Sequence, residues 1–219
     1  MKKVLGFLVV AAALASCSVL DQKVTYADGT AGKDDPIGLK GKVVTVSLLG
    51  NGARAQGDVR PLAMTTVSGT FDDISGVPGG VQLKTWGFEV SLTTPTGGAT
   101  LTGGTSCPAT ITVTLNSATI NVKDASNANG QTVTLTSNPS SMTLNRTSAS
   151  PCTYDVPATP IKIKGEIALS NLQSLVTILT TGGQNTVTAN IDYTTSPTAI
   201  GGSLGLTFGS GTGFVIAGI

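Results

Sequence analysis

Apolar and hydroxyl-bearing residues alternate along most of the chain after residue 42, and this period of two limits the fold more than any other feature. Val44, Val46 and Leu48 alternate with threonine and serine. The same pattern recurs around residues 88–92, 111–115, 120–122, 133–135, 161–169, 187–193, 204–208 and 214–216. Such alternation places one face of a strand in a core and the other in water, where β-branched threonine is favoured. We therefore expect an all-β, mainly antiparallel fold.

Glycine-containing turns separate these segments. Asn129-Gly130 is a strong hairpin signal and is expected to join strands around 118–124 and 131–137. The glycine-rich stretch 209–213 resembles a phosphate-binding loop in composition, but no helix pattern follows it, so we interpret it as a turn between two strands. About ten short strands with frequent turns favour a β-sandwich.

One segment breaks the period of two and predicts a short helix near 171–180. Its apolar residues follow the spacing of one helix face: Leu172, Leu175, Val176 and Leu179. Ser170 and Gln173 form a capping box, and Gly182-Gly183 can end the helix. We expect this helix to cover an open end or edge of the β core.

The chain begins with a basic and then apolar leader that ends at a cysteine. Lys2 and Lys3 precede an apolar run over 4–14, which is too short for a bilayer span of roughly 20 residues. The run leads into Leu14-Ala15-Ser16-Cys17, which resembles the lipobox of bacterial lipoproteins. This resemblance implies removal of residues 1–16 and attachment of diacylglycerol and further acyl chains, such as palmitate, to Cys17. It also implies an envelope location, at the outer rather than the inner membrane because serine rather than aspartate follows Cys17.

The polar residues after the lipobox predict a tether between membrane and domain. We assign 17–41 to the lipidated cysteine and tether, with a short ordered stretch near Val24-Thr25-Tyr26, and 42–219 to the β-sandwich domain. A fully flexible tether of this length would have a mean reach of about 25–30 Å.

Two cysteines remain once Cys17 carries lipid. Cys107 and Cys152 each adjoin a proline, which favours extended backbone at or beside them. Because cysteines of an exported chain usually pair, we expect a Cys107–Cys152 disulfide.

The sequence excludes most familiar catalytic chemistry. There is no histidine in the 219 residues, which removes Ser-His-Asp and Cys-His catalysis and histidine-ligated zinc. Glu89 and Glu166 are the only glutamates, and each falls on the polar phase of its segment, so we expect both to face solvent. We therefore expect no enzymatic activity, no catalytic residue, no metal and no cofactor.

Three acidic loops contain carboxylates of the kind that bind calcium. They contain Asp34-Asp35, Asp72-Asp73 and the residues 124–130. Calcium requires six or more oxygen ligands, and none of these loops supplies enough in the required spacing. We interpret residues 124–130 as a hairpin turn instead.

Charge narrows the class of partner. Loss of Lys2 and Lys3 with the leader lowers the formal net charge from +1 to −1, and no basic run follows, so nucleic acid is not an expected partner. We expect a structural or interaction module of the envelope that contacts an envelope protein or glycan through an outward threonine-rich face. The alternative is a carrier of lipid or another apolar small molecule, with its site between the sheets. A filled core favours the module, whereas an enclosed aliphatic cavity favours the carrier.

Overall fold

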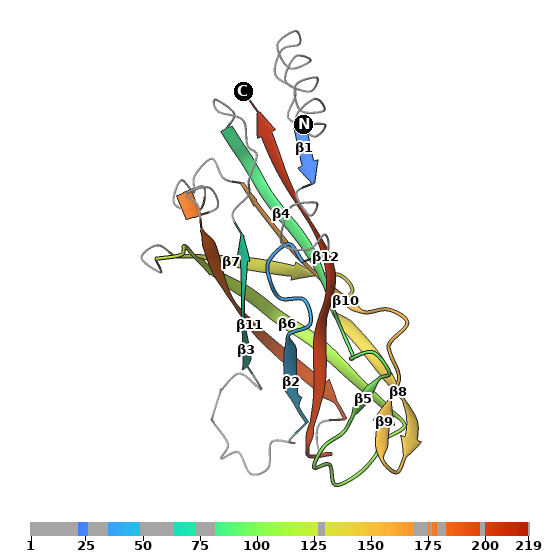
Figure 1. Cartoon of the computed structure of the whole chain (residues 1–219). Coiled ribbons are helices and arrows are strands. Elements are labelled where there is room, and N and C mark those ends of the chain that lie inside the picture. The colour runs from blue at the N-terminus through green and yellow to red at the C-terminus, as the bar shows by residue number, and fades with distance from the viewer. Residues whose placement is uncertain are drawn as a thin grey trace, which may run out of the picture.

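Antiparallel strands account for nearly all of the structure, a computed structural model shown in Figure 1. It describes residues 22–25, 35–48, 64–72, 82–126, 130–168, 175, 177–178, 183–197 and 200–218. The all-β, mainly antiparallel fold expected from the period of two is confirmed.

The strands form two facing sheets. The first has β11 (Gln184–Ser196) between β3 (Met64–Asp72) and β6 (Thr110–Lys123), while β7 (Gly130–Ser137) and β8 (Ser141–Ala149) share the other edge of β6. The second has β4 (Gln82–Thr93) between β10 (Ile161–Ala168) and β12 (Ser203–Gly218), while β1 (Gln22–Thr25) and β2 (Val43–Ser47) share the other edge of β12. We call these the β11 sheet and the β12 sheet.

Strands at the sides join the two sheets, as corner strands do in sandwiches. β7 begins on β6 and ends on β10. At another corner, β8 pairs with β9 (Cys152–Tyr154), and β9 pairs with β5 (Ala99–Thr100). Thr102 then pairs with Ser203 at the start of β12, which links this corner to the β12 sheet.

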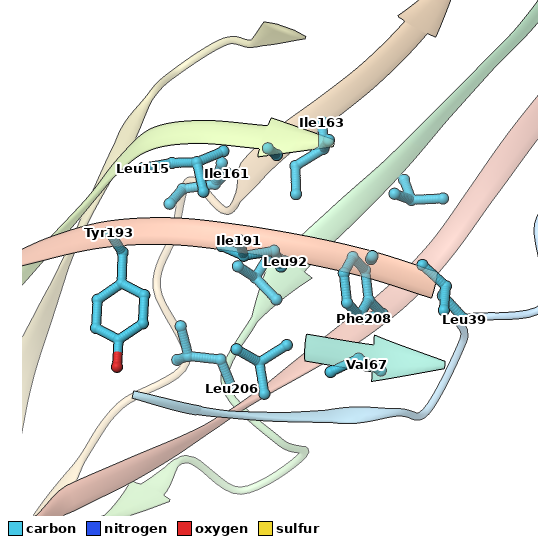
Figure 2. Packing of buried hydrophobic residues seen from close by; sticks show 14 of the residues in the cluster. Leu39, Val67, Leu92, Leu115, Ile161, Ile163, Ile191, Tyr193, Leu206 and Phe208 are labelled. Atoms are coloured by element: carbon cyan, nitrogen blue, oxygen red, sulfur yellow. The ribbon is translucent and has the colours of Figure 1, made fainter. Parts of the chain in front are cut away.

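The inward phase of the strands fills the space between the sheets with aliphatic and aromatic side chains. In Figure 2, Val67 of β3 and Ile191 of β11 lie close to Leu206 and Phe208 of β12. Trp86 of β4 is fully buried, and its ring stacks against Phe71 of β3, with ring centroids 6.2 Å apart. The expected division between apolar inward and hydroxyl outward residues is therefore correct.

A glycine in the β12 sheet, Gly165, makes room for the ring of Phe88. Phe88 of β4 is paired with Gly213 of β12 on one side and with Gly165 of β10 on the other. A Cβ atom at Gly165 would lie 2.5 Å from the ring of Phe88. The ring therefore packs where a side chain would otherwise stand.

Two pairs of expected strands each form one long strand, β6 in the first case and β12 in the second. The segments 111–115 and 118–124 are both part of β6, whose buried phase changes at the exposed pair Asn116-Ser117. A register shift between Asp192 and Tyr193 on β11 accommodates this change, so pairing continues along the strand.

The prediction of a turn at 209–213 was wrong. These residues lie within β12, where the register against β4 shifts between Phe208 and Gly211. Glycine within a strand often marks a bulge of this kind, and the strand continues because β4 runs alongside it.

The fold begins before residue 42, inside the expected tether. Ile37 and Leu39 are buried, and the N–H of Gly41 donates a 2.8 Å hydrogen bond to the carbonyl of Phe208. Gly38 has a φ of 70°, and a Cβ atom added to it would overlap the backbone carbonyl of Thr70, so a side chain at this position would clash. β1 also lies in this region, in agreement with the short ordered stretch expected near Val24.

Several expectations concern residues that the structure does not describe. The leader 1–16 and Cys17 lie outside the described residues, as does most of the helix expected near 171–180. The three described residues of that segment, Leu175, Thr177 and Ile178, are helical, and Leu175 and Ile178 are fully buried. β3 and β8 are strands of nine residues each that were not expected from the sequence.

Candidate contact surface

The outward side of the β11 sheet is a nearly neutral array of hydroxyl and amide side chains, which we call the hydroxyl face. It comprises Thr66, Ser68 and Thr70 on β3, Thr186, Thr188 and Asn190 on β11, Thr119 and Asn121 on β6, and Thr132 and Thr134 on β7. All are exposed or half-buried. The face is therefore the threonine-rich outward surface expected from the sequence.

Strand register arranges this face in rows that cross four strands. One row contains Ser68, Thr188, Asn121 and Thr132, and the next contains Thr66, Asn190, Thr119 and Thr134. Neighbouring strands are about 4.8 Å apart and alternate residues on one strand about 6.7 Å apart, which fixes the spacing of the array.

Side chains within the rows bind one another. The hydroxyls of Ser68 and Thr188 are 3.2 Å apart, and the hydroxyl of Thr66 donates to Asn190 Oδ1 at 3.0 Å. Asn121 Nδ2 donates to the hydroxyl of Thr132 at 3.1 Å. A hydroxyl has one donor and two acceptor lone pairs, so these groups keep capacity to bind a partner while the lateral bonds hold them in place. Charged side chains such as Lys123 lie at the border of the face.

The expected disulfide is present between Cys107 and Cys152, with Cα atoms 5.8 Å apart. It ties the segment before β6 to the start of β9. The guanidinium of Arg146 donates a 2.6 Å hydrogen bond to the carbonyl of Cys107, and the buried Tyr154 hydroxyl donates to the carbonyl of Pro108 at 3.0 Å. These bonds hold the corner around the disulfide.

A shallow, open hollow of about 280 Å³ adjoins the disulfide. It is lined by Leu101, Gly104, Thr105, Ser106, Cys107, Ala149 and Cys152. The lining carries no charged group, and the hollow lies at the β5–β9 corner rather than between the sheets. It matches neither a catalytic cleft nor the enclosed aliphatic cavity that a carrier requires.

The two glutamates lie on the outward side of the β12 sheet, as expected. Lys162 and Lys164 of β10 place their ammonium groups 3.1 and 2.9 Å from the carboxylate of Glu89. The hydrogen bond from Lys164 holds the pKa of Glu89 below its ordinary value, although burial acts in the opposite direction. Glu166 is exposed and is paired with Gly87, next to this cluster. Glu89 is therefore engaged in an exposed ion-pair cluster.

Two described residues of the acidic loops, Asp35 and Asp124, are used in local turns, whereas Asp72 is the last residue of β3. Asp35 Oδ1 accepts the N–H groups of Leu39 and Lys40, and Asp124 Oδ1 accepts the hydroxyl of Ser126 at 2.8 Å. Within the part of the chain that the structure describes, no three histidine, cysteine or acidic side chains come together as metal ligands. Asp34 and Asp73 lie outside that part.

Comparison with protein-family models, with curated proteins and with solved structures gave no match. None of the helical residues that the structure describes belongs to a helix long and apolar enough to cross a membrane.

Sequence reasoning missed which strands meet to make the hydroxyl face. β3 supplies three of its residues, and the alternation of Thr66, Ser68 and Thr70 with Val67 and Phe71 was the signal that could have identified it. Gly69 interrupts the apolar phase and obscured that pattern.

Proposed function

We propose that this protein is a non-enzymatic lipoprotein of the bacterial envelope, anchored through Cys17, in which the β-sandwich is a structural or interaction module. The anchor is supported by the leader and the lipobox Leu14-Ala15-Ser16-Cys17. The lipid on Cys17 attaches the protein to a membrane. We expect the outer membrane, because Ser18 follows the cysteine.

The main support for an interaction module is the hydroxyl face. Its laterally bonded hydroxyl and amide groups present both donors and acceptors with almost no charge, and this chemistry suits a neutral glycan or an uncharged protein surface. The residues of the hydroxyl face include no lysine or arginine, which a polyanion such as a nucleic acid requires.

The filled inward phase of the strands argues for the module over the alternative carrier. Val90, Ile163 and Leu206 are each at most 2% exposed and belong to one continuous cluster of buried side chains. Small and medium aliphatic groups on facing sheets interdigitate closely, which leaves little space for a ligand.

Lipid attachment is tested by growing cells with labelled fatty acid. The wild-type chain should incorporate label and fractionate with membranes. Cys17→Ala should lose both properties, whereas Cys107→Ala, as the matched control, should keep the label. Equal labelling of the Cys17→Ala variant would refute the anchor.

The contact surface is tested by a photocrosslinking amino acid placed at Thr188, in the middle of the hydroxyl face. The matched control is Thr212, which is exposed on the outward side of the β12 sheet. Irradiation of intact cells should give a discrete adduct from position 188 and not from position 212. Adducts of equal yield from both positions, or from position 212 alone, would contradict the assignment of the face.

A further inference from the structure

β1 fixes the place at which the chain leaves the folded domain toward its anchor. Gln22 pairs with Ala217 and Thr25 pairs with Phe214, so β1 lies against the last residues of β12. Cys17 precedes Gln22 by five residues. Because an extended chain spans at most about 3.6 Å per residue, the Cα atoms of Cys17 and Gln22 lie within about 18 Å of each other in any conformation.

The disulfide marks the opposite end of the same strand. Ser203 at the start of β12 pairs with Thr102, and the neighbouring Leu101 N–H donates a 2.9 Å hydrogen bond to the carbonyl of Cys152. β12 therefore runs from the disulfide corner to β1, as Figure 1 shows. Its 16 residues, at a rise of about 3.3 Å each, span about 50 Å.

The end of the domain at β1 also includes strand ends from the β12 sheet. Lys23 of β1 is at the register position of Ile216, which pairs with Thr85, and Thr85 pairs with Ala168 at the end of β10. We call this level of the sheet the anchor end. Lys84 of β4 precedes Thr85 at the anchor end, and lysine suits a surface of anionic lipid headgroups.

We propose that the anchor end rests at the lipid headgroups and that β12 holds the disulfide corner about 50 Å away from them. This orientation depends on lipid attachment at Cys17, as proposed above. In this orientation the domain stands upright on the membrane and does not move freely on a long tether. The reason is that pairing of β1 with β12 removes most of the reach of the expected tether.

The orientation is tested with the lipidated full chain in vesicles of phosphatidylethanolamine and phosphatidylglycerol that carry a fluorescent acceptor on their headgroups. Donor dyes are attached in turn to Ala168→Cys at the anchor end and Thr100→Cys beside the disulfide corner. Both native residues are exposed. Energy transfer to the headgroups should be severalfold stronger from position 168 than from position 100.

A pair of matched insertions isolates the role of β1. Six residues of glycine and serine are inserted either after Ser18, before β1, or after Gly32, between β1 and β2. The first insertion should weaken transfer from position 168, because it lengthens the chain between lipid and β1 by up to about 20 Å. The second should leave transfer unchanged, because β1 still holds the domain.

Three results would overturn the inference. Equal transfer from positions 168 and 100, or an equal effect of the two insertions in protein that floats with the vesicles, would refute the orientation and leave the lipid anchor intact. Failure of the wild-type chain to carry lipid or float would overturn the anchor and the orientation together. Equal denaturation midpoints for both insertion variants serve as the folding control.

Discussion

The hydroxyl oxygen of Tyr193 accepts a 2.6 Å hydrogen bond from the backbone N–H of Ser47, and this bond joins the β11 sheet to the β12 sheet through the interior. The same hydroxyl donates to the carbonyl of Thr45 at 3.4 Å. Tyr193 is only 3% exposed, and Figure 2 shows its ring directed into the space between the strands. The bond satisfies a polar group in a largely apolar core.

Removal of this hydroxyl should measurably destabilise the fold. We expect Tyr193→Phe to lower the free energy of unfolding by about 1–2 kcal/mol, because Ser47 N–H and Thr45 C=O lose a partner in a partly buried place. Thr188→Val is the control, since water can replace its exposed hydrogen bond to Ser68, and it should cost less than about 0.5 kcal/mol. Chemical denaturation measures both, and equal losses would contradict the role of the Tyr193 bond.

Stability should fall at high pH. Burial raises the pKa of Tyr193, opposed by the weaker effect of the Ser47 N–H, and burial likewise raises the pKa of Tyr154, opposed by the charge of Arg146. A tyrosine whose pKa is raised in the folded state favours folding while it is protonated. Its contribution to the free energy of unfolding is therefore complete below the ordinary pKa of 10.0 and is lost as pH rises above that value. We expect the stability of the double variant Tyr154→Phe/Tyr193→Phe to fall less steeply as pH rises above 10.0. An unchanged dependence would refute this origin.

The glycine beneath Phe88 should not tolerate a side chain. Gly165→Ala places a methyl group against the Phe88 ring, and we expect it to lower the free energy of unfolding by about 1–3 kcal/mol. Gly205→Ala is the matched control, because its nearest neighbour, Val43 Cγ1, would lie 3.4 Å away. Denaturation of both should show a loss for Gly165→Ala alone, and equal stability of the two variants would contradict the packing.

The disulfide should contribute strongly to stability. Cys107 and Cys152 are 45 residues apart, and the loss of loop-closure entropy predicts that Cys107→Ala/Cys152→Ala costs about 4 kcal/mol. Native, unreduced protein should react with alkylating reagent at neither position. Full alkylation of both in the native state would exclude the bond.

The period of two was sufficient to predict the class of fold, the apolar inward phase and the outward glutamates, because each depends only on which face of a strand a residue occupies. Strand continuity was not predictable in the same way. Glycines 209 and 211 favour a turn locally, but pairing with β4 keeps them in a strand. The burial of Ile37 and Leu39 likewise depends on their contact with strands distant in sequence.

The candidate surface was predictable only in composition. The sequence indicates that threonine faces outward, but the rows depend on the order β3, β11, β6, β7, which brings together residues as distant as Ser68 and Thr188. Register between strands that are far apart in the chain leaves no signal in a single sequence.

The intact mass of the wild-type protein, extracted from bacterial membranes and measured under native and denaturing conditions, tests the central claim most directly. The account predicts a polypeptide that begins at Cys17 and carries diacylglycerol and acyl chains, with one disulfide and no other small molecule bound in stoichiometric amount. A chain that begins elsewhere, or an unmodified Cys17, would contradict the lipoprotein. A lipid that is bound non-covalently in stoichiometric amount and lost on denaturation would contradict the interaction module and support the carrier.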